Sequence, residues 1–273
     1  MNYTIGLDSV ISLGATVVLG FFIPIALYIV MTKVFRCPGK IYLEGLTISI
    51  LVGLLLKQII HGLVLETGFG QMMMNNGWLR GLYSGLVSAL LEESVRIFMF
   101  KKRLADYLDH DFNAVTYGAG QGGGEMVYAL VVCLFSSMQA VMLIYSGQAE
   151  VLYYGLDGEA LESSLLAIER LTTVHPLTFL ASVVERLSVI VVHMSASVLV
   201  WFGVKEGGKT LWKLTGLAAA LHVLVEMVAP VFNQYGANLV IVEAGIVAVA
   251  VINGYVAYKV WKKYHKPAQE EEE

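Results

Sequence analysis

Residues Ser9–Thr32 read SVISLGATVVLGFFIPIALYIVMT and contain no charged side chain. A helix rises 1.5 Å per residue, so about 20 apolar residues cross the ~30 Å hydrocarbon core of a bilayer. Similar runs recur along the chain, in which 57% of the 273 residues are hydrophobic and only 15% are charged. A typical soluble domain carries about 25% charged residues. The composition therefore excludes an ordinary soluble protein and predicts an all-α, polytopic transmembrane helical bundle.

Seven apolar runs are long enough to span a membrane. They are Ser9–Thr32, Glu44–Leu65, Trp78–Phe100, Ala114–Ser137, Leu177–Phe202, Leu211–Pro230 and Ala237–Trp261. The longest stretch between two runs, roughly Gln148–Pro176, is shorter than a typical independent domain. We therefore expect one integral-membrane domain over residues 1–273.

Thirteen of the 18 Lys and Arg residues lie on alternate connections between these runs. They are Lys33, Arg36, Lys40, Lys101, Lys102, Arg103, Lys205, Lys209, Lys213, Lys259, Lys262, Lys263 and Lys266. Basic residues near span ends mark the cytoplasmic side, so we expect a multi-pass protein of the cell membrane with its N-terminus outside and its C-terminus in the cytoplasm. The acidic tail Glu270–Glu273 is predicted to be a solvated, disordered end, and no basic stripe indicates a nucleic-acid partner.

Two segments between the runs have amphipathic helical spacing. Glu159–Leu171 places Leu161, Leu165 and Ile168 at helical intervals, which predicts a surface helix on the outer side. Leu104–Phe112 has a similar pattern and predicts a second surface helix on the cytoplasmic side.

The fourth run begins with a glycine-rich stretch, Gly118-Ala-Gly-Gln-Gly-Gly-Gly-Glu125, and stays apolar to Ile144. This length exceeds what the hydrocarbon core needs, so the helix must tilt or project from the membrane. Glycine lets neighbouring helices approach closely in lipid and also loosens a helix. The stretch can therefore serve tight packing, room for a substrate backbone beside Glu125, or both.

Charged and titratable residues recur inside the predicted spans, although each charge at mid-bilayer costs at least ~2.5 kcal/mol and normally has a partner. They are Lys57, His61, Glu92, Glu93, Arg96, Glu125, Glu185, Arg186, His193, His222 and Glu226. We interpret Glu185 with Arg186 as a mutually neutralising pair at least as readily as a reactive one. Lys57 and His61 are interpreted as mainly structural.

Depth brings three of these residues together. Counting from the cytoplasmic ends of their spans, Glu92, His193 and His222 all lie about 14–15 Å deep. Glu125 and Glu226 lie about one helical turn further out, at about 20 Å. We expect one polar centre that opens toward the cytoplasmic half of the membrane.

Helical spacing assigns neighbours within each span. Arg96 lies three residues after Glu93 and four after Glu92, so its guanidinium can pair with either carboxylate. His222 and Glu226 are also four apart, so Glu226 can fix the imidazole tautomer directly or through water.

A glutamate with two histidines at one depth supplies the base and the oxyanion donors that peptide hydrolysis needs. Glu92, His193 and His222 are also an alternative site for a divalent metal such as zinc, because imidazole nitrogens and carboxylates are zinc ligands.

These residues resemble a superfamily of glutamic-type intramembrane proteases that includes the type II CAAX prenyl endopeptidases, the CPBP proteins, the PrsW proteases and the YhfC family. Glu92-Glu93-x-x-Arg96 is similar to the first motif in its PrsW and YhfC form. Gly-Gly-Gly-Glu125 resembles the second motif and His222-x-x-x-Glu226 the last, while His193 completes a YhfC-like set. The resemblance implies a four-helix catalytic core over residues 78–230.

The resemblance also implies a hydrolase in which Glu92 or Glu93 activates water. His193 and His222 would contact the water or the oxyanion, and Glu226 would orient His222. The implied partners are the bilayer and a membrane protein or peptide substrate, with no cofactor except the alternative metal.

This chain departs from the CAAX-type enzymes in two motifs. It has Glu125 in the second motif, where those enzymes carry His, and Glu226 in the last motif, where they carry Asn or a similar residue. CAAX substrate specificity therefore cannot be transferred to it. A non-proteolytic scaffold and an ion-coupled transporter remain as alternative functions.

Overall fold

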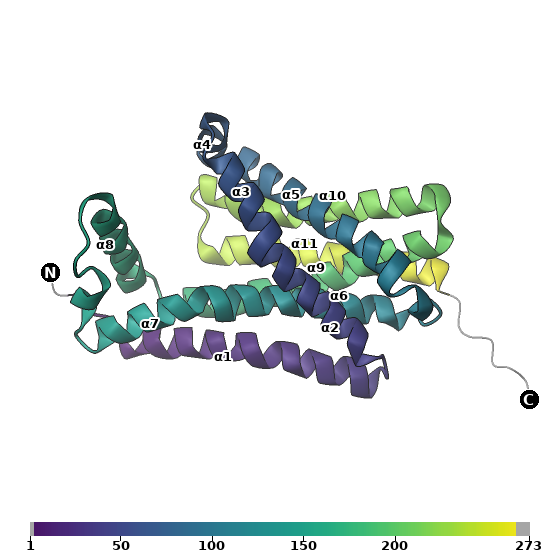
Figure 1. Cartoon of the computed structure of the whole chain (residues 1–273), viewed down its shortest axis with the longest axis horizontal. Coiled ribbons are helices and arrows are strands. Elements are labelled where there is room, and N and C mark those ends of the chain that lie inside the picture. The colour runs from purple at the N-terminus through teal and green to yellow at the C-terminus, as the bar shows by residue number, and fades with distance from the viewer. Residues whose placement is uncertain (1–2, 266–273) are drawn as a thin grey trace, which may run out of the picture.

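The computed structural model describes residues 3–265, so Lys266 and the tail Glu270–Glu273 lie outside the described residues. All long elements in the described part are helices, and Figure 1 shows them as an elongated bundle. They are α1 (Leu7–Ile29), α2 (Gly39–Leu51), α3 (Gln58–Leu65), α4 (Gly68–Met74), α5 (Gly77–Phe98), α6 (Phe112–Met126), α7 (Cys133–Tyr145), α8 (Gly158–Thr173), α9 (Leu177–Glu206), α10 (Gly208–Gln234) and α11 (Leu239–Tyr264).

Six helical segments of the described chain are long and apolar enough to cross a membrane. They are Leu7–Val34, Gly39–Leu65, Phe112–Tyr145, Leu177–Glu206, Gly208–Gln234 and Leu239–Tyr264. Two of them contain two α-helices each, because π-helical turns at Val52–Lys57 and Val127–Val132 join α2 to α3 and α6 to α7, and a third π-helical turn at Val30–Val34 extends α1. The predicted all-α membrane bundle is confirmed.

The expected span Trp78–Phe100 corresponds to α5, which has 22 residues but does not qualify with the other six. α5 is less apolar than the other six segments because it carries four charged residues, Arg80, Glu92, Glu93 and Arg96. A seventh crossing by α5 therefore stays a prediction.

α5 packs closely along α10 and runs antiparallel to it. A Cβ atom on Gly77 would lie 2.3 Å from the Pro230 carbonyl oxygen, and one on Gly85 would lie 2.9 Å from the Val223 Cα atom. The order of these contacts shows the opposite chain directions, which Figure 1 also shows. The glycines of α5 thus bring its buried charges against α10.

The two ends of the bundle differ as the charge pattern predicts. Figure 1 places the start of α1 and the end of α11 at opposite ends of the molecule. The connections α1–α2, α5–α6 and α9–α10, which carry basic residues, lie at the end where α11 finishes. The orientation of that end toward the cytoplasm stays a prediction.

The two predicted surface helices have different outcomes. The helix expected over Glu159–Leu171 is confirmed as α8, whose Ile168 packs in a buried cluster with Ile144. Leu104–Phe112 forms only a short 3-10 turn at Ala105–Tyr107, so the second prediction is wrong. Leu104 is fully buried in the core, so the start of this segment is not at the surface.

Asp111 anchors the end of the α5–α6 connection, immediately before α6 begins. Its carboxylate accepts hydrogen bonds from Trp201 Nε1 at 3.0 Å and Lys205 Nζ at 2.6 Å, and it lies 2.8 Å from His265 Nδ1. Burial by itself raises the pKa of Asp111, but these partners together hold the pKa below its ordinary value. One carboxylate thus ties the start of α6 to α9 and to the end of α11.

The glycine-rich stretch packs α6 between α2 and α9. A Cβ atom on Gly120 would lie 2.1 Å from the Tyr42 carbonyl oxygen, and one on Gly118 would lie 2.5 Å from the Met194 Cα atom. The backbones of both neighbours therefore fill the space that the absent side chains leave. Of the two interpretations, tight packing is supported, and the expected room for a substrate backbone at these glycines is not.

An aromatic cluster closes the end of the bundle that carries the basic residues. Phe100 packs edge-on against Tyr117 and Trp201 with ring centroids 4.9 and 5.0 Å apart, and all three are fully buried. Each lies between that end and the polar residues of its own helix. The expected opening toward this half of the membrane is therefore blocked by close-packed aromatic rings.

We predict that Gly120→Ala destabilises the protein by about 1–3 kcal/mol, because the added methyl group meets backbone that cannot move away. Thermal unfolding of the detergent-purified protein measures the effect. Gly216→Ala is the matched control, since no atom of a neighbouring element lies within 4 Å of its Cβ position. The control should be neutral or slightly stabilising, and equal melting temperatures for the two variants would contradict the packing argument.

Candidate active site

The centre of the site is built on the last turns of α5. Glu92, Glu93 and Arg96 are all buried there. Arg96 pairs with Glu93 three residues before it, as helical spacing allows. Its Nε and Nη2 atoms also donate to Gln121 Oε1 on α6, at 3.1 and 2.6 Å. One guanidinium thus orients a carboxylate on its own helix and an amide on the next.

Gln121 is a site residue that the sequence analysis missed. Because Arg96 holds its carbonyl oxygen, its amide nitrogen faces Glu92 Oε2 at 3.3 Å. The sequence signal for it is weak, since a neutral amide among glycines does not stand out. Its spacing of four residues before Glu125 could have found it, because both side chains then share one face of α6.

His222 on α10 faces both glutamates of α5. Its Nδ1 atom lies 3.4 Å from Glu93 Oε1, and its Nε2 atom lies 4.0 Å from Glu92 Oε2. In the part of the chain that the structure describes, no hydrogen bond joins Glu226 to His222. Glu93 therefore orients this ring in the place that we expected Glu226 to take.

His193 on α9 connects two carboxylates. Its Nε2 atom lies 2.7 Å from Glu125 Oε2, and its Nδ1 atom lies 3.4 Å from Glu92 Oε2. The Nη2 atom of Arg96 is 3.3 Å from the same Nδ1. A ring protonated at Nε2 satisfies these contacts, because it donates to Glu125 and accepts from Arg96. The structure thus brings both predicted histidines to Glu92, and both nitrogens of His193 are engaged.

Lys57 also reaches the centre, although we interpreted it as mainly structural. Its Nζ atom lies 2.6 Å from Glu92 Oε1 and comes from the turn between α2 and α3. His61, the residue one helical turn further along, instead contacts the Tyr83 hydroxyl at 3.1 Å. Spacing within one helix could not reveal the contact of Lys57 because it joins two different helices.

Arg186 links the centre to a further carboxylate. Its Nη1 atom lies 2.6 Å from Glu125 Oε1, and its other amino group pairs with Glu185, as the sequence predicts. The guanidinium therefore holds one carboxylate on α6 and one on its own helix. Of these two contacts, the sequence indicated only the local one.

A catalytic zinc ion is bound by three protein donor atoms and keeps one open position. The donor atoms of this site can be compared with that requirement. Glu92 Oε1 is bound to Lys57, and both nitrogens of His193 already face other side chains. Two donor atoms keep a free lone pair: Glu92 Oε2, which accepts only the long contact from Gln121 at 3.3 Å, and His222 Nε2. Over residues 3–265, no group of three His, Cys, Asp or Glu side chains converges on a metal position. As arranged, these residues do not fit a zinc ion.

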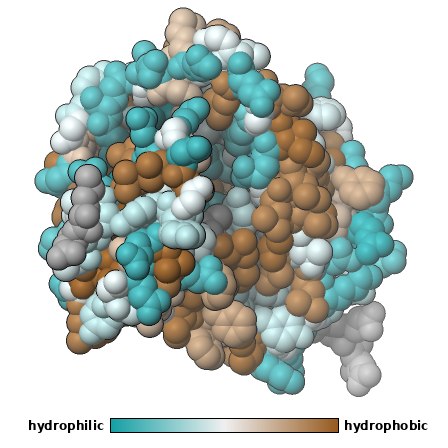
Figure 2. Space-filling view, turned by 60° about the vertical axis from the view of Figure 1, so that its left-hand side comes forward, coloured by the Kyte–Doolittle hydropathy of each residue, from teal (hydrophilic) through white to brown (hydrophobic). Residues whose placement is uncertain are grey.

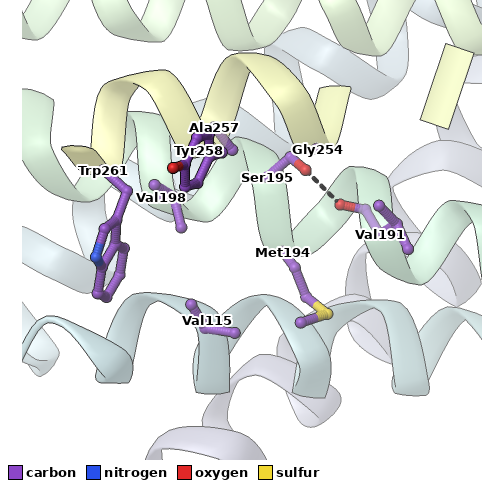
Figure 3. Close-up of a pocket in the computed structure, with 9 residues that line it drawn as sticks. All are labelled: Val115, Val191, Met194, Ser195, Val198, Gly254, Ala257, Tyr258 and Trp261. Carbon is purple, nitrogen blue, oxygen red and sulfur yellow. Dashed lines mark hydrogen bonds between the residues drawn. The ribbon is translucent and has the colours of Figure 1, made fainter. Parts of the chain in front are cut away.

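A separate groove of about 260 Å³ lies between α6, α9 and α11 and is lined almost wholly by apolar side chains. Figure 3 shows Met194 and Val198 of α9 facing Val115 and Trp261 across it. A helix turns about 100° per residue, so His193 points to the opposite side of α9. This groove is not part of the carboxylate site.

Together these features describe a polytopic helical membrane protein with a buried centre of glutamates, histidines and paired cations. The model of the YhfC intramembrane metalloprotease family matches residues 19–249, and the chain belongs to this family. It is 25% identical over 253 residues to the uncharacterized membrane protein YhfC of Bacillus subtilis (strain 168), covering 89% of this chain and 94% of the relative. No solved structure matches the chain.

We predict that Lys57→Met destabilises the protein by about 3–5 kcal/mol, because it leaves the Glu92 charge buried without its partner. The double variant Lys57→Met with Glu92→Gln should recover most of this loss. Thermal unfolding in detergent measures both. Arg103→Met is the control, because the Arg103–Glu44 pair lies at the surface and should contribute less than about 1 kcal/mol. Equal losses for Lys57→Met and Arg103→Met would contradict the place of Lys57 in the buried centre.

Proposed function

We propose that this protein is an intramembrane endopeptidase in which Glu92 activates water to hydrolyse a peptide bond of a membrane-embedded or membrane-adjacent substrate. The observation that carries the proposal is the position of Glu92 Oε2, which lies 4.0 Å from His222 Nε2 in a buried centre. That gap is too long for a direct hydrogen bond and short enough for one water molecule to bridge. Membership in a family described as intramembrane metalloproteases supports the protease class.

The catalytic core in this proposal consists of α5, α6, α9 and α10, within residues 78–230. Each of these helices contributes at least one side chain to the centre around Glu92. The contributions are Glu92, Glu93 and Arg96 from α5, Gln121 and Glu125 from α6, His193 from α9 and His222 from α10.

The partners of the two glutamates favour Glu92 as the base. Both oxygens of Glu93 are engaged, one with Arg96 and the other with His222. Glu92 has Lys57 on one oxygen, and its other oxygen accepts from the Gln121 amide at 3.3 Å and faces both histidines, His193 at 3.4 Å and His222 at 4.0 Å. We assign Glu92 as the proton acceptor and Glu93 as the residue that positions Arg96 and His222.

The proposed reaction follows from these positions. Glu92 takes a proton from water, and the water oxygen adds to the carbonyl carbon of the scissile bond. The Gln121 amide and the imidazolium form of His222 can donate to the resulting oxyanion. Protonated Glu92 then transfers its proton to the amine nitrogen as the C–N bond breaks. His193 and Glu125 act as positioning residues, because His193 lies against Glu92 Oε2 and Glu125 holds the other nitrogen of the His193 ring.

We predict that Glu92→Gln lowers proteolysis by about 10²–10⁴-fold, since an amide cannot accept the proton from water. Membrane-anchored peptide libraries incubated with the purified protein in liposomes, with mass spectrometry of the products, give the measurement. Glu44→Gln is the matched control, because Glu44 pairs with Arg103 away from the site and should keep full activity.

Undiminished cleavage by Glu92→Gln would rule out this mechanism. If the wild-type protein cleaves nothing but retains a stable partner in pull-downs, the scaffold alternative is favoured instead. Ion uptake into liposomes that depends on Glu125 would favour the transporter.

We also predict that proteolysis does not need a metal, because two free donor atoms are too few for a catalytic zinc site. Dialysis against EDTA should leave the cleavage rate unchanged, and elemental analysis should find less than stoichiometric zinc. Wild-type protein never exposed to chelator is the control. Loss of activity that returns only when zinc is restored would contradict the prediction.

A further inference from the structure

Two polar cavities meet at the ion pair between Glu125 and Arg186. The first, of about 130 Å³, lies between α9, α10 and α11, and the second, of about 120 Å³, lies beneath the α2–α3 helix. Glu226 lines the first and Glu92 lines the second, while Glu125 and Arg186 line both. Each cavity has room for several water molecules, and its polar lining offers them partners.

Exposure decreases from the first cavity inward. The side chain of Glu185 is 33% exposed, Arg186 is 17% and Glu125 is 19%. His193 falls to 1% and Glu92 to 4%. The ion pair thus lies between the first cavity and the buried His193 and Glu92, while the second cavity is also lined by the exposed side chain of Gln58.

The environment of Glu226 also indicates water in the first cavity. Among the described residues, Glu226 has no hydrogen-bond or ion-pair partner, although it lies within a membrane-spanning helix. Such a carboxylate normally faces a partner or a water-filled space. Figure 2 brings this end of the molecule forward and shows its surface hollowed near the middle, with hydrophilic side chains along part of the rim.

We propose that the two cavities form the route by which water reaches Glu92, with Arg186 as the barrier between them. The use of this water as co-substrate rests on the proposed function, whereas the route itself does not. Arg186 holds both Glu125 and Glu185, so it can release Glu125 while it keeps one carboxylate partner. The aromatic cluster around Phe100 closes the opposite end. Water therefore enters from the half of the bundle where α9 begins.

The route is tested by labelling single cysteines with a water-soluble methanethiosulfonate reagent, which reacts with the thiolate that forms only in water. In a background without Cys37 and Cys133, Ala229→Cys reports on the first cavity and Ala129→Cys on the second, since these alanines line them. Val251→Cys is the control on the lipid-facing surface, where the side chain is 65% exposed. We expect Ala229→Cys to react at least about tenfold faster than Val251→Cys.

The barrier is tested in the same assay. Arg186→Ala should accelerate labelling of Ala129→Cys at least about tenfold, whereas Arg103→Ala, which removes an ion pair at the surface, should not. Equal rates for Ala229→Cys and Val251→Cys would overturn the route. An Ala129→Cys rate that Arg186→Ala leaves unchanged would overturn the barrier. Labelling needs no substrate, so either result is independent of whether the protein proves to be a protease.

Discussion

Three cations and four carboxylates are paired inside this membrane bundle, and their pairing limits how its helices can be arranged. Taking one ion out of water costs several kcal/mol, and a close partner with good geometry offsets that cost only in part. Lys57, Arg96 and Arg186 each come from a different helical segment, and each meets at least one carboxylate. The positions of α2, α5, α6 and α9 are therefore linked through these contacts.

Close packing makes the contacts possible. Without side chains at Gly118 and Gly120, α6 approaches both α2 and α9 and carries Glu125 into the centre. The same approach lets Glu125 reach His193 and Arg186, which lie seven residues apart on one face of α9. The glycines thus contribute to function through packing, because they determine how near the polar side chains come.

The description of the family as metalloproteases and the donor atoms of this chain point in different directions. Zinc needs ligands whose lone pairs are free, and here fixed cations or neighbouring side chains engage most of them. A base that acts directly on water needs only one carboxylate oxygen with a lone pair left beside a hydrogen-bond donor, and Glu92 Oε2, which accepts one long contact from Gln121, faces His222 in this way. The proposed mechanism follows from this difference, because the donor atoms that remain available suffice for a general base and not for a zinc site.

From the order of residues alone, one can infer the apolar runs, the end of the bundle where basic residues gather and neighbours within a helix, such as Glu93 and Arg96. The common depth of one glutamate and two histidines can be inferred in the same way. These inferences rest on the constant rise and turn of an α-helix, which a single segment reveals. Only the folded bundle shows that Lys57 meets Glu92 and that the Arg186 guanidinium crosses to α6. Contacts between helices depend on how each helix is rotated and crossed against its neighbours, and packing of the whole bundle sets those angles.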